Sequence, residues 1–519
     1  MTEIKQQKAK ICFLATAAFS LVANAFAYFN LTPHHDAIHH TLLFNDKHEI
    51  AIGRFLHPVW GKLISDITVP WFTGLLSILF LSLTVWFCIE ILKIRSKAGI
   101  ILTSGFLSVN YSITELCGTF GFVLGAYTFA LMLICAGVWM VTNIKRKTAV
   151  IAAAVLICIS MGLYQAYITV GFTLFLILVM RQTSSKESLS SHLCEWIRYV
   201  AAFVMGGALY FIVYKAVLHF TGIEPENSNI SLSHLSNMDI RYLVDGGILV
   251  YKNFFRFWFL SKAPSTWLIA LVNLTLIVTA VVVAVSRILK QKEARVGRIL
   301  LLFSCVALFP LASMLMPLLM HQMNFRTIYA VFLFYPGCIA LIEMNGPLLF
   351  CTKPSVNKRF IGRRATQALC LACALILFSF VRFSNEAYTV SKVIYDRTIT
   401  ATTMILVAMN SSEEYSPGET EVVVIGRLDS KENNITSMKN IDRYRPIEGY
   451  KKVSITYPLT FERYFRLMGQ PINMNHNESI ITLYESKPEV KEMPCYPAAG
   501  YCRMVDGRMV IKLAEENTE

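Results

Sequence analysis

The sequence predicts an all-α polytopic membrane protein of about eleven transmembrane helices, followed by a small α+β domain at the C-terminal end. Of its 519 residues, 55% are hydrophobic and only 16% are charged, and the mean hydropathy is +0.51. Apolar stretches recur over residues 1–384, whereas residues 385–519 are polar. A soluble protein this apolar would expose patches that cause aggregation, so a water-soluble multidomain protein is excluded.

Each predicted span is an apolar segment close to the roughly 20 residues that a helix needs to cross a bilayer. The segments are 10–29, 71–92, 98–116, 119–142, 148–163, 166–180, 199–219, 264–286, 299–319, 327–349 and 365–384. We divide the long stretch 148–180 at the polar pair Tyr164 and Gln165. The first segment is predicted to be a retained signal anchor, because no small-residue cleavage site followed by a soluble domain is seen.

The distribution of basic residues predicts the orientation of the spans. The net charge of +14 comes from 48 Lys and Arg against 34 Asp and Glu, an excess that in a membrane protein reflects cytoplasmic loops rather than nucleic-acid binding. Basic loops recur at 5–10, 93–97, 145–147, 181–198, 287–298 and 353–364. They alternate with cation-poor loops, which places the N-terminus in the cytoplasm and residues 385–519 outside.

The polar C-terminal part has the sequence pattern of a small α+β domain. Residues 421–425 and 479–484 have the composition of strands, and residues 416–418 form a Ser-Pro-Gly turn signal. Its two cysteines, Cys495 and Cys502, are predicted to form a disulfide in an oxidising compartment, with two free thiols as the alternative.

The first outer loop, residues 30–70, contains six of the eleven histidines. Apolar residues recur at helical spacing over 52–63, which predicts an interfacial helix with Trp60 at the level of the lipid headgroups. His35 and His39 would share one face of a helix, which is one arrangement of metal ligands. A suitably spaced second carboxylate and an HExxH sequence are both missing, so the site is predicted to hold no metal.

Asp36 is the acidic residue that closely follows the first span. A carboxylate at the membrane boundary can act as a general base. A solvated loop residue or a helix N-cap is an equally good interpretation of a single carboxylate.

The loop resembles that of the serotype-converting O-antigen glucosyltransferases of the glucosyltransferase II type, multispan enzymes of the GT-C class. In that family two aromatic residues and Asn-Asp-Asp are followed about twenty residues later by Asn-Gly-Arg-Pro-Leu. The matching stretches here are His34-His35-Asp36 and Ile52-Gly53-Arg54-Phe55-Leu56. His35 replaces the first acid of the family pair and Phe55 stands where Pro is usual, so the acidic role falls on Asp36 alone.

The resemblance implies an enzyme of the bacterial inner membrane that modifies lipopolysaccharide on the periplasmic side. The implied donor is undecaprenyl-phosphate-glucose and the implied acceptor is a lipid-linked O-antigen repeat unit. In an inverting displacement Asp36 would be the catalytic base, with His35 as the second candidate. The sequence contains no GxGxxG or P-loop motif, as expected if no nucleotide sugar is bound.

Two arginines are predicted to hold the donor phosphate, because guanidinium binds phosphate oxygens bidentately. They are Arg54 and Arg326, although Arg326 could also be a snorkelling residue at a helix end. His39, Asp46 and His321 are predicted to contact the donor or acceptor sugar.

Two other classes of function compete with a glucosyltransferase. An O-antigen polymerase, or another enzyme of lipid-linked glycans, would also need polar outer loops and arginines. A lipid-linked sugar flippase or transporter is less favoured, because the sequence shows neither an internal repeat nor a cluster of charges inside the spans. In each case the expected partners are membrane lipids and lipid-linked sugars, and not nucleic acid.

Overall fold

The computed structural model describes residues 3–33, 37–40, 46–64, 67–226, 239–259, 267–291, 295–345, 359–428 and 458–515. Contacts divide the chain into two compact units. The first comprises Met1–Asn30, Asn45–Cys117 and Gly121–Asn385, and the second comprises Leu31–Phe44, Gly118–Phe120 and Glu386–Glu519.

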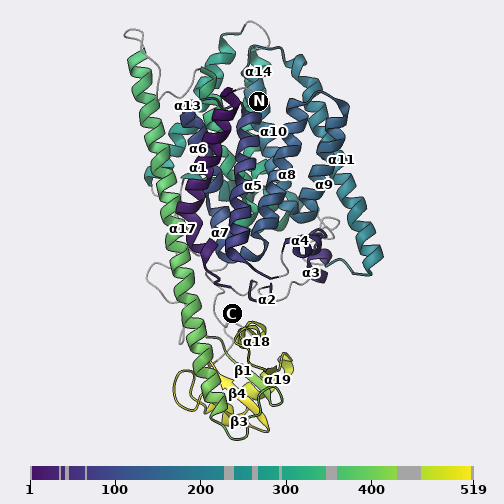
Figure 1. The fold of residues 1–519 in the computed structure, drawn as a ribbon, viewed down its shortest axis with the longest axis vertical. Helices are drawn as coiled ribbons and strands as arrows, with labels where there is room; N and C mark the ends of the chain where they lie inside the picture. The colour runs from purple at the N-terminus through teal and green to yellow at the C-terminus, as the bar shows by residue number, and fades with distance from the viewer. Residues whose placement is uncertain are drawn as a thin grey trace. The chain divides into compact units, whose positions relative to one another are not determined.

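The first unit is a helical bundle (Figure 1). Its longer helices are α1 (Glu3–Phe29), α5 (Pro70–Leu92), α6 (Lys97–Ser108), α8 (Leu124–Asn143), α9 (Lys147–Leu163), α10 (Ile168–Thr183), α11 (Leu189–Thr221), α12 (Ile240–Phe259), α13 (Trp267–Leu289) and α14 (Arg295–Ser313). Its shorter helices are α3 (Asp46–Ala51), α4 (His57–Ile64), α7 (Tyr111–Thr119), α15 (Leu315–Met320) and α16 (Phe334–Ile342). Helix α1 packs on α5, α5 on α8, α8 on α9 and α9 on α11. The helix α17 (Arg359–Asn410) has 52 residues and belongs to the first unit as far as Asn385.

The helices support a multispan membrane protein, although the count of eleven spans is not confirmed. Within the described part of the chain, eight helices are long and apolar enough to cross a membrane, or nine if a bent pair counts as one span. Helix α9 and the helical segment Tyr329–Ile342 are apolar but shorter than the other spans. The described residues of the eleven predicted segments are mainly helical, so within them the difference in the count comes from length and bending.

The bent pair is α6 and α7, which meet at an angle of 40°. Asn110 lies at the break and bonds to the backbone on both sides of it. Its side chain donates to the carbonyl of Phe106 and accepts from the amide of Ile113 at 3.1 Å. An asparagine that satisfies the free backbone groups on both sides allows a helix to end and restart within the bundle.

The predicted break between the fifth and sixth apolar segments is present. Helix α9 ends at Leu163, a 3-10 turn covers Gln165–Tyr167, and α10 begins at Ile168. Tyr164 therefore lies in a short connection between two helices.

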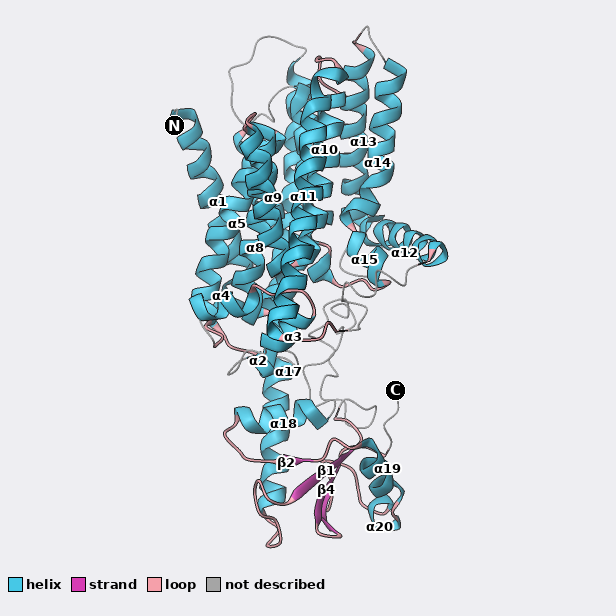
Figure 2. Cartoon of the chain, turned by 90° about the vertical axis from the view of Figure 1, so that its right-hand side faces the viewer, coloured by secondary structure: helices cyan, strands magenta, loops and turns pink. Residues whose placement is uncertain are grey.

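Helix α12 was not predicted from the sequence. It lies across the direction of α13 and α14 (Figure 2), and it packs against α13, α14 and α15. Phe254 and Trp258 are buried on one face, whereas Ile248 and Phe255 are exposed on another. Arg241, Asp245 and Lys252 interrupt the apolar residues of this segment, so a search for long apolar stretches passes over it.

The second unit contains a four-stranded sheet with the strand order β2-β1-β4-β3. The strands are β1 (Glu421–Ile425), β2 (Asn473–Met474), β3 (Cys502–Val505) and β4 (Arg508–Lys512). β1 is parallel to both β2 and β4, and β3 and β4 form a hairpin. Asp506 and Gly507 form its two-residue turn with φ values of 47° and 73°, the backbone that an Asp-Gly hairpin turn requires.

Helices cover both faces of this sheet. On one face α18 (Pro458–Leu467) and the end of α17 pack against Val422 and Val424. On the other face α19 (Glu478–Ser486) and α20 (Pro488–Lys491) pack against Val423 and Ile425. The predicted strand at 421–425 is confirmed.

The predicted strand at 479–484 is wrong, because this segment is the helix α19. The Asn477 side chain caps the helix by accepting a hydrogen bond from the amide of Ser479, and Ile481 and Tyr484 then lie on its buried face. A spacing of three residues between buried positions is a helical period, whereas the β-propensity of this segment favours a strand.

The predicted disulfide between Cys495 and Cys502 is not formed in the structure, where both are free cysteines. Cys502 Sγ lies 3.3 Å from Met509 Sδ, on the neighbouring strand β4. Cys495 Sγ lies 3.5 Å from Glu515 Oε1. The two sulfurs therefore face different parts of the unit.

Candidate active site

The loop that carries Arg54 is a turn between two short helices, and not the single amphipathic helix predicted over 52–63. Helix α3 ends at Ala51 and α4 begins at His57. Gly53 lies between them with a φ of 90°, which residues with a side chain rarely adopt. Beyond the turn, Trp60 stacks on Phe129 with ring centroids 5.3 Å apart, so its ring packs against the bundle.

Three consecutive backbone carbonyls of this turn are fixed by side chains from other helices. Tyr214 donates to the carbonyl of Ala51 at 2.8 Å, Gln165 to that of Ile52 at 2.8 Å, and Tyr210 to that of Gly53 at 3.0 Å. We call these three side chains the carbonyl clamp. It holds the backbone at Arg54 through groups that come from α11 and from the connection between α9 and α10.

Phe55, where the family usually has Pro, fits this arrangement. Its ring stacks near Tyr210 at 5.7 Å, and a Cβ atom added at Gly162 would lie only 2.9 Å from it. The neighbouring amides of Arg54, Leu56 and His57 donate backbone hydrogen bonds, but within the described residues the Phe55 amide does not. A proline there would lose no such bond, so the departure from the family pattern leaves the turn intact.

Gly53→Ala is expected to lower the transfer activity that the resemblance implies at least tenfold, while the protein still inserts in the membrane. A Cβ atom at this position would lie 2.5 Å from Tyr210 Oη and 2.6 Å from Gln165 Nε2, so two members of the clamp must move. The positive φ adds about 1 kcal/mol of strain or more. Transfer rates of membrane-extracted protein measure the effect, and Gly207→Ala, at a position open to added atoms, is the control. Normal transfer by Gly53→Ala would show that the turn does not hold the site.

The Arg54 guanidinium lies against two tyrosine rings. Its central carbon is 5.7 Å from the ring centroid of Tyr127 and 5.3 Å from that of Tyr164. The two rings stack on each other at 3.9 Å. Cations are attracted to the faces of aromatic rings, so the pair provides a surface that orients the guanidinium.

A buried carboxylate fixes Arg54 from the other side. Arg54 Nη1 lies 3.3 Å from Glu49 Oε2, and His57 Nδ1 lies 2.8 Å from the same oxygen. The side chains of Glu49 and His57 are only 4% and 1% exposed, whereas that of Arg54 is 15% exposed. The triad therefore has one member that reaches the surface, and that member is the cation.

The surroundings keep Arg54 charged. Burial alone would lower the pKa of Arg54, but Tyr127 and Glu49 act in the opposite direction, and the net pKa lies above its ordinary value. Arg54 Nε is buried and has no hydrogen-bond partner among the described residues. The guanidinium therefore retains donor capacity that Glu49 does not use.

Arg326, the second predicted phosphate ligand, lies by the same tyrosines. Tyr164 donates to its carbonyl at 3.4 Å, and Arg326 is close enough to interact electrostatically with Tyr127. Its amide donates to Glu115 Oε2 at 2.5 Å, and its Nη1 lies 3.9 Å from Glu115 Oε1. Glu115 is fully buried in α7, so this arginine too is positioned by a carboxylate behind it.

The structure describes only some of the remaining predicted site residues. His35 and Asp36 lie outside the described residues, and of His39 only the backbone, in the short helix α2 (Ala37–His40), is described. Asp46 is the first residue of α3 and is partly exposed. The His321 ring stacks on Tyr242 at 3.8 Å and its Nε2 lies 3.0 Å from the Tyr242 carbonyl, which joins α12 to the end of α15.

Several residues of the site were missed by the sequence analysis. Glu49 and His57 were read only as parts of a histidine-rich loop, and Glu115 and Tyr164 only as markers between spans. Glu49 and His57 lie in two different short helices, and Glu115 and Tyr164 lie far along the chain from both, so the periodicity of one segment does not find them. The buried carboxylates are the usable signal, since an acid within an apolar segment seldom lacks a cationic partner.

A comparison with known families agrees with this geometry. No curated protein matches the chain. The sequence profile of the family described as Glucosyl transferase GtrII matches residues 25–337, which include the loop with Arg54, the two stacked tyrosines and Arg326. The match covers more than half of the 519 residues, and the chain therefore belongs to the GtrII glucosyl transferase family, as a membrane-embedded member.

Proposed function

We propose that this protein transfers glucose from undecaprenyl-phosphate-glucose to a lipid-linked O-antigen repeat unit at the periplasmic face of the bacterial inner membrane. Such a change in the O-antigen would alter lipopolysaccharide and with it the serotype. A GT-C architecture suits this reaction, since the donor and the acceptor both reach the enzyme through the membrane. The family assignment supports the glucosyl transfer, and the arrangement around Arg54 supports a phosphate-linked donor.

The observation that carries the proposal is the fixed, charged Arg54. It is backed by Glu49 and the two tyrosine rings, retains an unused Nε donor, and is 15% exposed. A leaving lipid phosphate gains negative charge as the glycosyl bond breaks, and a preorganised cation stabilises that charge without having to move. Arg326, positioned by Glu115 near the same tyrosines, would bind the phosphate from a second direction.

In the proposed reaction the acceptor hydroxyl oxygen attacks the anomeric carbon from the face opposite the lipid phosphate. The new carbon–oxygen bond forms as the bond to the phosphate oxygen breaks, so the configuration inverts. Asp36 accepts the hydroxyl proton, and the lipid phosphate leaves with the electron pair. His35 is the alternative base, because imidazole titrates near neutral pH. A single base is enough, and we propose that no metal ion takes part.

We further propose that His39, Asp46 and His321 contact one of the two sugars. His321 would do so while it holds α12, since its ring lies at the junction of α12 and α15. Asp46 would act from the start of α3, the helix that precedes the Arg54 turn.

The proposal is tested with purified full-length protein in lipid, supplied with undecaprenyl-phosphate carrying radiolabelled glucose and with lipid-linked O-antigen. Radiolabel on the acceptor supports glucosyl transfer. Unlabelled repeat units joined to one another would instead indicate a polymerase. Movement of the labelled lipid across the bilayer without a new glycosidic bond would indicate a flippase.

In the same assay Arg54→Ala is expected to lower kcat/KM about ten- to hundredfold or more. The loss of a charge-assisted bidentate contact costs roughly 1.5–3 kcal/mol. Arg54→Lys should retain part of the activity, because it keeps the charge but loses the planar pair of donors. Lys62→Ala removes an exposed cation of α4 and is the control. Wild-type kinetics in Arg54→Ala would exclude Arg54 from the donor site.

A further inference from the structure

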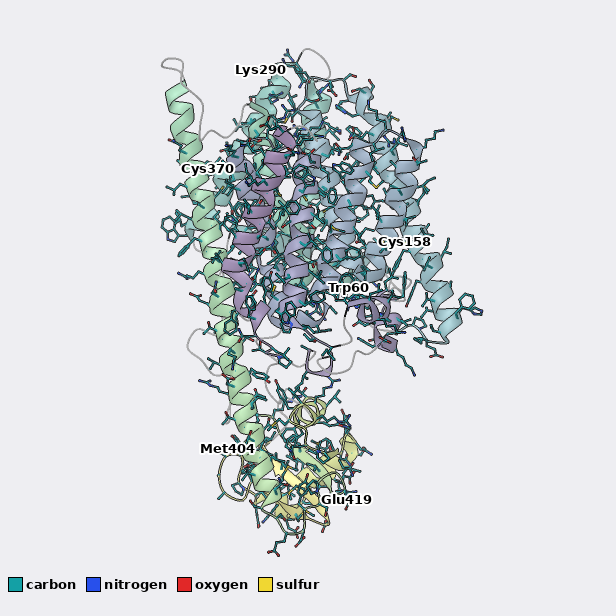
Figure 3. All side chains as sticks on the ribbon, viewed as in Figure 1. Trp60, Cys158, Lys290, Cys370, Met404 and Glu419 are labelled. Carbon is teal, nitrogen blue, oxygen red and sulfur yellow. The ribbon has the colours of Figure 1, made fainter. Side chains whose placement is uncertain are left out.

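A cavity of about 1130 Å³ opens at the end of the helical bundle opposite Arg54. Helix α8 has Tyr127 of the active site near its start and Thr142 of the cavity near its end. Helix α10 likewise follows Tyr164 and ends by Arg181 of the cavity. Two residues labelled in Figure 3 mark these two ends of the bundle. Trp60, in the chain segment after Arg54, marks the end with the active site, and Lys290, which follows α13, marks the end with the cavity. The cavity is therefore separate from the active site.

Positive charge dominates the lining of this cavity. Three carboxylates line it, Glu187, Glu195 and Glu343. The cations that line it are Lys93, Arg95, Lys145, Arg181, Arg198 and Arg287. Six cations against three carboxylates leave an excess of three positive charges around a space that is large enough for a small organic ligand.

Two of the three carboxylates accept hydrogen bonds from neutral groups, and the third lies beside a histidine. Glu343 accepts from the backbone amide of Arg95 at 2.8 Å and from the Ser96 side chain. Glu195 accepts from Gln182 at 3.0 Å. Glu187 lies 3.3 Å from His192 Nε2. The two oxygens of Glu343 are therefore already bonded to the Arg95 and Ser96 amides and to the Ser96 hydroxyl.

Arg181 is the cation with the least compensation. Its Nε is buried without a hydrogen-bond partner among the described residues, and Arg95 and Arg287 each repel it more strongly than Glu343 attracts it. Like charges in a partly desolvated cavity are unfavourable unless an anion lies between them. The guanidinium groups of Arg95 and Arg181 have no hydrogen bond or ion pair elsewhere in the described chain, so their donors are available.

The wall beside Arg181 is rigid before any ligand arrives. The buried Arg298 donates to the carbonyls of Thr183 at 2.9 Å, Ser185 at 3.1 Å and Glu187. Arg287 donates to the carbonyl of Ser184 at 3.3 Å from the other side. A preformed wall lowers the cost of ordering side chains on binding.

We infer that this cavity is a binding site for a phosphate group, carried either by a membrane phospholipid or by a soluble phosphate ester. Arg95 and Arg181 supply planar pairs of donors that match phosphate oxygens, and Arg287, which donates to the carbonyls of Ser184 and Met344, adds positive charge. A bound phosphate would remove the repulsion among these three side chains. The site is a second anion site of the chain, and it does not depend on the reaction proposed at Arg54.

The test measures the midpoint of thermal unfolding, Tm, of full-length protein in a neutral detergent at constant ionic strength. The two probes are inorganic phosphate and short-chain phosphatidylglycerol, each compared with chloride. We expect saturating probe to raise the Tm by at least about 2 °C. Arg181→Gln should abolish this rise and, without probe, should unfold no earlier than the wild type because it relieves repulsion. Arg146→Gln, which removes an exposed arginine at the same end outside the cavity, should keep the full rise.

The two probes separate the sources of the phosphate. A rise with both indicates that the phosphate group itself is recognised, a rise with the lipid alone indicates a membrane ligand, and a rise with inorganic phosphate alone indicates a soluble one. Arg95→Gln, an exposed position, repeats the test if Arg181→Gln fails to fold. The absence of any rise, or the same rise in both cavity variants as in the wild type, would overturn the inference.

Discussion

Glu49→Ala is expected to reduce glucosyl transfer by a hundredfold or more. The Glu49 carboxylate is 4% exposed and holds both Arg54 and His57 through one oxygen. Removal of one partner from a buried ion pair costs about 3–5 kcal/mol, because the other charge is left without compensation. Arg54 would then turn towards water or draw in a counterion, and it would leave the position in which a donor phosphate meets it.

This prediction is checked by kcat and KM in the transfer assay, with Glu49→Gln as the close variant. The amide keeps the shape of the carboxylate but not its charge. Glu49→Gln should therefore transfer glucose faster than Glu49→Ala and more slowly than the wild type. Glu226→Ala is the matched control, since Glu226 pairs with the half-exposed His48 at 3.0 Å and such surface pairs contribute about 0–1 kcal/mol. If Glu49→Ala transfers glucose normally, Arg54 does not need the carboxylate.

Asp36→Asn is expected to lower the rate of transfer by at least about a hundredfold, the usual scale for the loss of a general base. Asparagine keeps the size and hydrogen bonding of aspartate but cannot accept a proton. The variant should therefore insert normally and still bind the donor lipid, because the proposed phosphate contacts come from Arg54 and Arg326. The loss should appear in kcat and not in donor affinity.

His35→Ala is the companion variant for Asp36→Asn. If Asp36 is the base, His35→Ala should keep most of the activity. Near-normal transfer by Asp36→Asn together with an inactive His35→Ala would assign the base to the histidine. Full activity in both would place the base elsewhere, and the buried Glu49 would then be the nearest described carboxylate to Arg54.

The helices could be predicted well from the sequence, because a membrane span has a strong local signal. The break at Tyr164 and Gln165 was found from two polar residues in an apolar stretch, and it is present in the structure. The transverse helix α12 was missed because its period is amphipathic and its apolar content is moderate. In the second unit the helix 478–486 was read as a strand, since its capping residue Asn477 was not considered.

The candidate site was predicted in part. Arg54 and Arg326 were selected for their chemistry, and the structure places both beside the Tyr127–Tyr164 pair. Glu49 was not selected, because its contact with Arg54 depends on the turn at Gly53 and not on a regular spacing. Contacts made across a turn or between helices leave no periodic trace in one sequence.

The carbonyl clamp has a consequence for how this enzyme family can vary. The side chains of Tyr210, Tyr214 and Gln165 donate hydrogen bonds to the backbone carbonyl oxygens of residues 51–53. Every amino acid has such a carbonyl. Apart from Gly53, these positions therefore hold the turn through backbone atoms, which do not change with the side chain. Because Ile52 is buried, substitutions at 51 and 52 that keep residue 52 apolar should leave the turn in place, whereas loss of any of the three donating side chains should loosen it.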